Sequence, residues 1–253
     1  MGLLAIIGGS GFETLPGFEV DSRAPVSTPY GPSSADLTRG RLHGMELVFL
    51  PRHGPGHSIP PHRINYRANL WALADVGVDE VIALAAVGGI GPAHAPLTLS
   101  VPDQIVDYTH GREHSVFDGG VGDGVVHVDM TEPYCMRLRT ALLEAGRSAS
   151  LSVHDGGTCG VTQGPRLETT AEIRRLERDG CDIVGMTAMP EAGLARELGL
   201  CYATLAFVVN WAAGKGEGPI AMDKIEANLA LCRAAVDRLL DTLAVTRGGS
   251  APD

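Results

Sequence analysis

The sequence predicts a single α/β domain in which a central mixed β-sheet is flanked by helices. Short apolar segments alternate along the chain with longer segments of helical periodicity, an order typical of α/β folds. The composition, with 44% hydrophobic and 20% charged residues, is that of a globular chain able to bury a core. The 33 glycines show no repeating period, which is typical of many tight turns between strands and helices.

Six short apolar runs are expected to form strands, and most of them end in glycine or a polar cluster. Because these runs are almost continuously hydrophobic, they are typical of strands that are covered on both faces. In chain order they are Leu3–Ile7, Glu46–Leu50, Glu80–Val87, Gln104–Asp107, Asp182–Met186 and Tyr202–Val209.

Five segments between these runs are expected to form helices. In chain order they are Asn65–Val76, Pro133–Ala145, Thr169–Asp179, Pro190–Leu198 and Met222–Leu243. The Gly-rich and charged segments 108–131 and 211–221 are expected to be surface loops. No change of composition divides the chain, so we expect one domain over residues 1–247 and a disordered tail over residues 248–253.

Charge and cysteine content exclude several classes of protein. With 20 basic and 30 acidic residues, the formal net charge of -10 argues against general nucleic-acid binding, and an anionic ligand needs a locally positive pocket. The five cysteines include no C-x-x-C pair, which favours reduced, buried thiols and a cytoplasmic location. The N-terminus does not resemble a signal peptide, and no apolar run has the length of a membrane span.

Glycine-rich and polar clusters follow the predicted strands, at the sheet edge where α/β proteins bind ligands. After the first strand, GGSG at 8–11 offers backbone N–H groups and the Ser10 hydroxyl to an anion, although a simple tight turn is also compatible. The cluster is not a dinucleotide fingerprint, because Thr14 stands where its last glycine belongs, and the chain contains no P-loop.

The segment PRHGPGH at 51–57 is a more specific indication of an anion site. Arg52 and His53 directly follow a strand and combine a guanidinium fork with an imidazole, although a solvated surface loop is the alternative. His57 is expected to line the same loop. A zinc site formed by His53, His57 and His62 is disfavoured because an H-E-x-x-H motif and cysteine partners are both missing.

Three later clusters are compatible with the other side of a pocket. Glu168, just ahead of the helix that starts at Thr169, either favours the helix dipole or accepts hydrogen bonds from a ligand ring. Met186 and Met189 suit core packing as well as ligand contact. Asn210 ends an apolar strand, so its amide either caps a turn or binds a ligand. Together the strand ends predict one pocket for an anion and a ring.

The same motifs resemble those of the trimeric purine nucleoside and methylthioadenosine phosphorylases. The matching segments, in order, are IIGGSGF, TPYG, RHGPGH with NYRANLWAL, GPRLET and MTAMPEAGLARELG. The resemblance as a whole covers nearly the whole chain, from Ile6 to about residue 240. The resemblance implies an α/β sheet surrounded by helices, a homotrimer, and phosphorolysis of a purine nucleoside. It implies inorganic phosphate as co-substrate and no metal or organic cofactor.

The resemblance also assigns roles to individual residues. Asn210, Glu168 and His53 are the expected catalytic residues. Phosphate is expected at Ser10, Arg52, His53, Ala85, Ala86 and Thr187, where Ala85 replaces a hydroxyl residue that the family often carries and so offers only its backbone. The nucleoside is expected at His57, Leu167, Glu168, Met186, Asn210, Ala212, Met222 and Ile225.

Two parts of the chain resemble different branches of this family. Glu168 and Asn210 resemble the enzymes for 6-oxopurines, because a carboxylate accepts from N1–H and an amide donates to O6 or N7. The adenine enzymes carry serine at position 168 and aspartates at 210 and 212. The N-terminal half resembles methylthioadenosine phosphorylase, whose apolar 5′ pocket Met222 and Ile225 would supply. The combination implies phosphorolysis of S-methyl-5′-thioinosine to hypoxanthine and 5-methylthioribose 1-phosphate, in purine salvage.

Several alternatives stay open on the sequence alone. A general 6-oxopurine nucleoside phosphorylase would act on inosine or guanosine, and a methylthioadenosine phosphorylase would release adenine. The glycines at 8–11 are compatible with a dinucleotide-dependent oxidoreductase, whose remaining fingerprint is missing. A non-catalytic binding protein would not need Arg52, His53 and Thr187 together.

Overall fold

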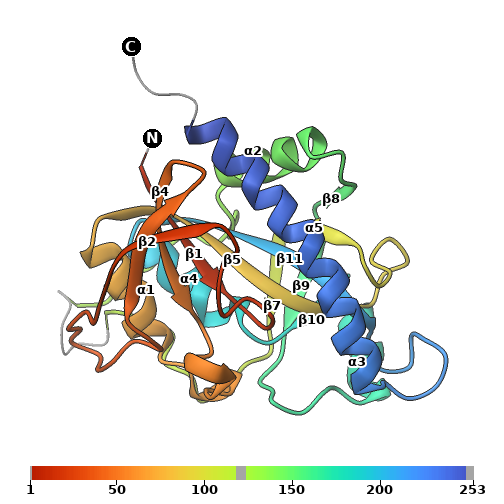
Figure 1. The fold of residues 1–253 in the computed structure, drawn as a ribbon. Coiled ribbons are helices and arrows are strands. Elements are labelled where there is room, and N and C mark those ends of the chain that lie inside the picture. Colours follow the sequence, from red (N-terminus) through yellow and green to blue (C-terminus); the bar gives the residue numbers. More distant parts are fainter. Residues whose placement is uncertain (1, 118–123, 249–253) are drawn as a thin grey trace.

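A central sheet of eleven strands organises the part of the chain that the computed structural model describes, residues 2–117 and 124–248 (Figure 1). The sheet is mixed, and helices cover it, which confirms the predicted fold class. In chain order the strands are β1 (Leu3–Gly8), β2 (Phe18–Ala24), β3 (Leu37–Leu42), β4 (Met45–Pro51), β5 (Val78–Gly89), β6 (Leu99–Val101), β7 (Gln104–Asp107), β8 (Val153–Asp155), β9 (Thr158–Val161), β10 (Ile183–Gly185) and β11 (Cys201–Trp211).

Strand β5 is the centre of this sheet. The main path runs β2-β3-β4-β1-β5-β10-β9-β7, and β11, β6 and β8 branch from β5. Strands β4, β1, β5 and β11 are parallel to their neighbours in this group, so their carboxyl ends meet at one edge. Strand β10 is antiparallel to β5, with Ile183 opposite Gly89, and therefore carries the chain back along β5 towards Ala86. This arrangement brings four strand ends and the segment after β10 together.

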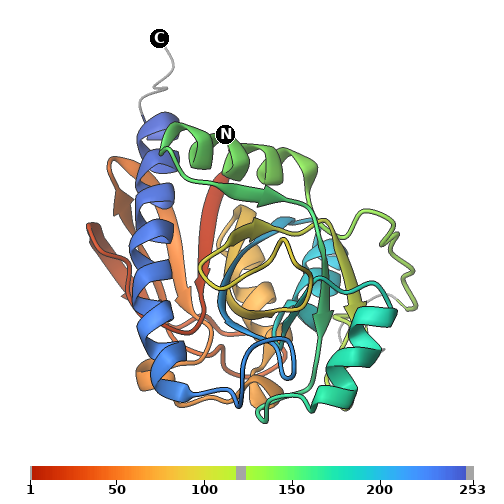
Figure 2. The same ribbon diagram turned by 90° about the vertical axis from the view of Figure 1, so that its right-hand side faces the viewer.

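Five helices lie on the two faces of the sheet in the described residues (Figures 1 and 2). Helices α2 (Met136–Ser148) and α5 (Met222–Gly248) contact each other and β11, whereas α1 (Tyr66–Asp75) and α4 (Ala188–Glu197) contact each other on the opposite face. Helix α3 (Thr170–Arg178) begins with a capping box between Thr169 and Glu172, and two 3-10 turns span Pro55–His57 and Pro61–Arg63.

The alternation of side chains along β1 explains how one strand contributes to the hydrophobic cores on both faces of the sheet. Leu4 and Ile6 belong to the core cluster under α2 and α5, whereas Ala5 and Ile7 belong to the cluster under α1 and α4. Successive residues of a strand point to opposite faces, so a continuous apolar run is the pattern that a doubly covered strand requires.

All six predicted strands and all five predicted helices are present, with ends that differ by a few residues. Five further strands, β2, β3, β6, β8 and β9, were not predicted. Strand β2 is almost entirely exposed, so it lacks the apolar pattern of a buried strand and is defined by its antiparallel pairing with β3. Strands β6, β8 and β9 have only three or four residues and depend on partners that are distant in sequence.

The expectation of five reduced thiols is wrong for two cysteines. Cys135, just before α2, and Cys201, the first residue of β11, form a disulfide across a separation of 66 residues. The backbone N–H of Cys135 donates to the Tyr202 carbonyl, which holds the two segments together and places the sulfurs side by side. Spacing along the chain does not show such proximity. Cys159, Cys181 and Cys232 are free and buried, as predicted.

Helix α5 and strand β11 both extend into segments that were expected to lack helix and strand. Helix α5 runs to Gly248, so the expectation that residue 248 belongs to a disordered tail is wrong, and residues 249–253 of the expected tail lie outside the described residues. The described parts of the expected loop 108–131 contain no helix or strand, and residues 118–123 lie outside the description. Trp211, expected in a loop, ends β11. None of the described helices is long and apolar enough to cross a membrane.

Candidate active site

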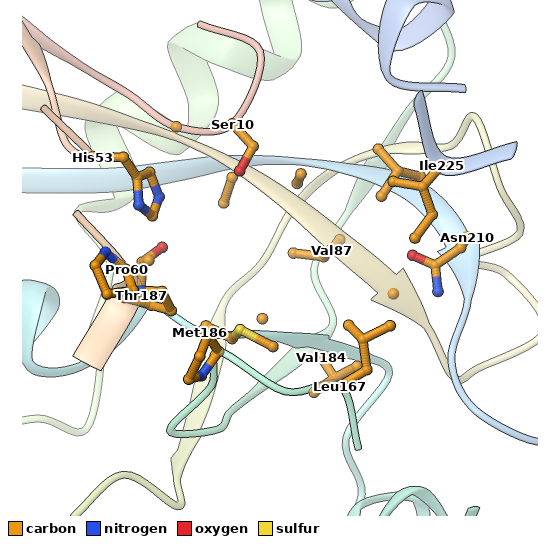
Figure 3. A pocket seen from close by; sticks show the side chains of 18 of the residues that line it. Ser10, His53, Pro60, Val87, Leu167, Val184, Met186, Thr187, Asn210 and Ile225 are labelled. Carbon is orange, nitrogen blue, oxygen red and sulfur yellow. The ribbon is translucent and has the colours of Figure 1, made fainter. Parts of the chain in front are cut away.

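A cavity of about 530 Å³ lies at the edge where the parallel strands end (Figure 3). Its walls come from the segments that follow β1 and β4, from the carboxyl-terminal part of β5, from β10 and β11 with the residues after them, from the loop before α3, and from the start of α5. Every residue that the sequence placed in the pocket lines this one cavity: Ser10, Arg52, His53, His57, Ala85, Ala86, Leu167, Glu168, Met186, Thr187, Asn210, Ala212, Met222 and Ile225.

The cavity has two chemically different ends. Figure 3 shows Ser10, His53 and Thr187 around one end, and Leu167, Asn210 and Ile225 around the other. Met186 lies between these groups. Hydroxyl, imidazole and guanidinium groups suit an anion at the first end, and an amide beside apolar side chains suits a polar ring at the second.

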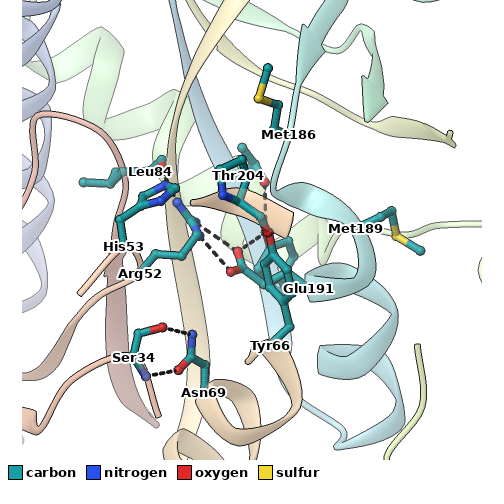
Figure 4. A network of polar contacts seen from close by, with 12 residues as sticks. Ser34, Arg52, His53, Tyr66, Asn69, Leu84, Met186, Met189, Glu191 and Thr204 are labelled. Atoms are coloured by element: carbon teal, nitrogen blue, oxygen red, sulfur yellow. Dashed lines mark hydrogen bonds and ion pairs between the residues drawn. The ribbon is translucent and has the colours of Figure 1, made fainter. Parts of the chain in front are cut away.

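Arg52 is the most strongly constrained side chain at the anion end. It is 1% exposed, and its Nε and Nη2 donate to the two oxygens of Glu191 at 2.8 and 2.9 Å, while Nη1 donates to the Leu84 carbonyl at 2.9 Å (Figure 4). A guanidinium has five N–H groups, so one remains on each terminal nitrogen for a ligand. Burial opposes the charge, but Glu191 outweighs it and leaves the pKa of Arg52 above its ordinary value.

Glu191 and Tyr202 were not predicted as part of the site. Glu191, on α4, is fully buried, and its Oε2 also accepts from the Tyr202 hydroxyl at 2.9 Å. Burial, and then the Glu191 charge, raise the pKa of Tyr202 well above its ordinary value, so the phenol stays a donor. The signal in the sequence was a lone carboxylate among the apolar residues of AMPEAGLA, because a buried acid needs a cationic partner.

Gly9 shows why glycine is needed next to Arg52. A Cβ at this position would lie 2.3 Å from the Leu84 carbonyl oxygen and 3.0 Å from Nη1 of Arg52. The Arg52 backbone N–H donates to the Gly8 carbonyl at 2.9 Å, which holds the two strand ends together. Only a residue without a side chain therefore permits this close approach.

His53 is arranged as a neutral hydrogen-bond acceptor. Its Nδ1 lies 2.9 Å from the Ile59 carbonyl, which can only accept, so Nδ1 carries the proton and Nε2 keeps a lone pair. Burial, together with the charge of Arg52, lowers the pKa of His53 from 6.5 to about 4. The ring of His57 stacks on His53 at a centroid distance of 4.2 Å. At neutral pH, His53 therefore adds no positive charge to the anion end of the cavity.

The polar groups at the ring end are partly engaged with their surroundings. Asn210 Nδ2 donates to the Trp211 carbonyl at 2.7 Å, which leaves its second N–H and its carbonyl oxygen. Glu168 Oε1 accepts from the Thr162 hydroxyl at 2.6 Å. The apolar wall beside them includes Ile220, Met222 and Ile225.

Arg112, which the sequence placed in a surface loop, is a further residue that sequence reasoning missed. Its guanidinium donates to the carbonyls of Met186 at 2.8 Å, Met189 at 2.6 Å and Gln163 at 2.8 Å. Burial lowers its pKa from the ordinary value. Arg112 thus joins the segment of Met186 to the loop that leads to Glu168, although its neighbours Glu113 and His114 are exposed, as expected of a surface loop.

The histidines near the cavity do not form a metal centre in the described structure. Within residues 2–117 and 124–248, no group of three or more His, Cys, Asp or Glu side chains is placed to hold a metal ion.

Known proteins resemble this chain over most of its length. Residues 3–244 match the model of the Phosphorylase superfamily. The chain is 51% identical to the probable S-methyl-5'-thioinosine phosphorylase of Xylella fastidiosa over 242 residues, which are 95% of this chain and 97% of that protein. It is 49% identical to the 6-oxopurine nucleoside phosphorylase of Pyrococcus furiosus over 215 residues, 83% of this chain and 80% of that protein.

Solved structures show the same fold. The methylthioadenosine phosphorylase from Schistosoma mansoni in complex with adenine matches with a TM-score of 0.93 and 34% identity. The match covers 99% of this chain and 93% of that chain.

Replacing Glu191 by glutamine should strongly destabilise the fold. The change leaves the Arg52 charge buried without its counter-charge, a defect that typically costs about 3–5 kcal/mol. Urea unfolding of Glu191→Gln would measure the loss. Glu144→Gln is a matched control, because Glu144 contacts Arg147 at 3.9 Å with both side chains exposed, and such pairs contribute about 0–1 kcal/mol. Equal losses in the two variants would contradict the importance of the buried pair.

His53 should make the stability of the protein fall in mild acid. Because its pKa is about 4 in the fold and 6.5 ordinarily, the unfolded chain binds the proton first. The His53 contribution is thus complete above pH 6.5 and is lost as the pH falls from 6.5 towards 4, with a slope of at most about 1.4 kcal/mol per unit. NMR titration of the ring should give a midpoint near 4. A midpoint near 6.5 would show that neither burial nor Arg52 disfavours the charged ring, and would contradict this prediction.

Proposed function

Because the chain belongs to the phosphorylase superfamily, we propose that it cleaves S-methyl-5′-thioinosine with inorganic phosphate to hypoxanthine and 5-methylthioribose 1-phosphate. The observation that carries this proposal is the two-ended cavity, which combines the Arg52 anion site with Glu168, Asn210 and an apolar wall. The relative of Xylella fastidiosa, 51% identical, supports the choice of nucleoside.

The anion end supplies the groups that orient phosphate. The two N–H groups of Arg52 that remain free hold two oxygens of the phosphate, and Ser10 and Thr187 add hydroxyl donors. Neutral His53 accepts from the protonated oxygen of a hydrogen phosphate through Nε2. The backbone at Ala85 and Ala86 lies beyond the last pair of β5 with β1, at Ala83, which leaves that edge of β5 open to a ligand.

The reaction needs positioning and charge stabilisation more than a covalent catalyst. A phosphate oxygen attacks C1′ of the sugar while the bond from C1′ to the purine nitrogen breaks, through a transition state with oxocarbenium character. The phosphate charge stabilises the developing cation, and Met186 packs on the sugar. The departing purine takes the electron pair of the broken bond. Asn210 donates to N7 or O6, and Glu168 accepts from N1–H, so both stabilise the leaving base.

The apolar wall distinguishes the 5′ substituent. Ile220, Met222 and Ile225 give no hydrogen-bonding side chain to a 5′-hydroxyl, and they favour a methylthio group. General 6-oxopurine nucleoside phosphorylase activity is the second candidate, since the Pyrococcus furiosus relative is 49% identical. Methylthioadenosine as main substrate is a weaker candidate, because Glu168 and Asn210 match an oxopurine.

The same proposal extends to assembly, cofactors and location. The family resemblance supports a homotrimer, which mass measurement in solution tests. Phosphate is the co-substrate without a metal or organic cofactor, so activity should survive a chelator.

The three free thiols are compatible with a cytoplasmic location, and the Cys135–Cys201 disulfide argues against it. Alkylation of thiols before cell lysis tests this location. Alkylated Cys135 and Cys201 would support the cytoplasm, and an intact disulfide would argue against it.

Purified protein should release hypoxanthine from S-methyl-5′-thioinosine only when phosphate is present. We expect kcat/KM to be at least tenfold higher than for inosine, because the methylthio group gains contact with the apolar wall, worth about 1–3 kcal/mol. Chromatography of the released base measures both reactions. Absence of release with phosphate would overturn the proposal, whereas a preference for inosine or guanosine would support the second candidate.

Asn210→Asp should shift the preference towards 6-aminopurines. A carboxylate at position 210 accepts from the exocyclic amine of adenine, whereas it repels the O6 acceptor of hypoxanthine. We expect the ratio of kcat/KM for methylthioinosine to that for methylthioadenosine to fall at least tenfold, because an unpaired buried polar group penalises the wrong base. The KM for phosphate, bound at the other end of the cavity, should not change. An unchanged ratio would refute the role of Asn210.

A further inference from the structure

We propose that Thr162 is a positioning residue that orients the Glu168 carboxylate and thereby sets the preference for 6-oxopurines. The inference rests on the proposed function, because it concerns the base end of the same cavity. Thr162 follows β9 and does not line the substrate cavity. It lies in a second, polar cavity of about 640 Å³, and Glu168 lines both cavities, so Glu168 stands between Thr162 and the substrate.

The hydrogen bond between the two side chains has a defined direction. Thr162 Oγ1 lies 2.6 Å from Glu168 Oε1 and 3.5 Å from the Gly185 carbonyl. A hydroxyl has one proton and both neighbours are acceptors, so the proton goes to the nearer oxygen, Oε1 of Glu168. Oε2 of Glu168 makes no hydrogen bond within residues 2–117 and 124–248, and it is the oxygen left for a ligand.

Thr162 is itself firmly held. Its backbone N–H donates to the Gly185 carbonyl at 2.9 Å, and its own carbonyl accepts from Arg112 at 3.3 Å. Arg112 also holds the carbonyl of Gln163 at 2.8 Å. Glu168, in contrast, lies in a segment without helix or strand, ahead of the N-cap of α3. The Thr162 hydroxyl therefore connects an anchored backbone to a carboxylate on a loop.

This contact has a consequence for base selection. With Oε1 engaged by a donor, the carboxylate cannot rotate freely, and Oε2 is presented as an acceptor. The N1–H of a 6-oxopurine satisfies it, whereas the N1 of a 6-aminopurine brings a second lone pair. Without the hydroxyl, Glu168 is free to rotate, and Oε2 is no longer presented to the base in one fixed direction. Thr162 thus contributes to selectivity without touching the base.

The test compares Thr162→Val, which keeps the shape and removes the hydroxyl, with Thr162→Ser, which keeps the hydroxyl. For Thr162→Val we expect the ratio of kcat/KM for methylthioinosine to that for methylthioadenosine to fall about tenfold to hundredfold, and the Kd of hypoxanthine to rise against that of adenine. The KM for phosphate should stay unchanged, and Thr162→Ser should restore the ratio.

Thr109→Val is the matched control, because Thr109 lines the second cavity and its hydroxyl contacts His114 at 3.3 Å instead of Glu168. Thr162→Val with the wild-type ratio, or with equal losses on both nucleosides and a raised KM for phosphate, would overturn the positioning role. Failure of Thr162→Ser to restore the ratio would do the same.

The two proposals fail in distinguishable ways. Wild-type protein that binds hypoxanthine but cleaves no nucleoside would overturn the proposed function, while the Kd values of the variants would still decide the role of Thr162. If inosine is the better substrate, the ratio of inosine to adenosine replaces the methylthio pair. Wild-type protein that binds neither base would overturn both.

Discussion

The buried ion pair between Arg52 and Glu191 is the constraint on which the rest of the site depends. It joins the end of β4 to α4 across the sheet edge, and both side chains are almost fully buried. Burying two charges is favourable only when geometry and additional hydrogen bonds compensate the lost hydration. The two-oxygen contact of Glu191, the Leu84 carbonyl and the Tyr202 hydroxyl supply that compensation. The close approach of Gly9 follows from the same geometry.

The proposed function requires an anion site in a chain with a net charge of -10, and this pair forms part of that site. Glu191 cancels most of the Arg52 charge, and His53 is neutral at ordinary pH because burial lowers its pKa to about 4. Affinity for an anion at this end of the cavity would therefore depend on N–H and O–H groups that already point towards the ligand position, and less on net positive charge. Such fixed dipoles need no reorganisation when the ligand arrives, which suits a site that stabilises charge during a reaction.

The opposite end of the cavity is organised by a second polar network, around Arg112. Arg112 links the Met186 segment to the loop of Thr162 and Gln163, and Thr162 in turn contacts Glu168. The antiparallel course of β10 along β5 brings this network beside the parallel strand ends. In the proposed function, separate networks that share one cavity recognise the anion and the ring, which would allow the selectivity for the base to vary without disturbing the anion end.

The sequence by itself determined the α/β class, six strands, five helices and the residues that line the cavity. Continuous apolar runs such as Leu3–Ile7 report burial on both faces, and polar residues at strand ends, such as Arg52 and Asn210, meet wherever parallel strands end. The tertiary structure alone decided the partners: Glu191, which lies 139 residues from Arg52, the contact of Thr162 with Glu168, and the Cys135–Cys201 disulfide. It also decided the short strands β6, β8 and β9. Local patterns encode burial and turns, whereas pairing depends on which segments the folded chain brings into contact.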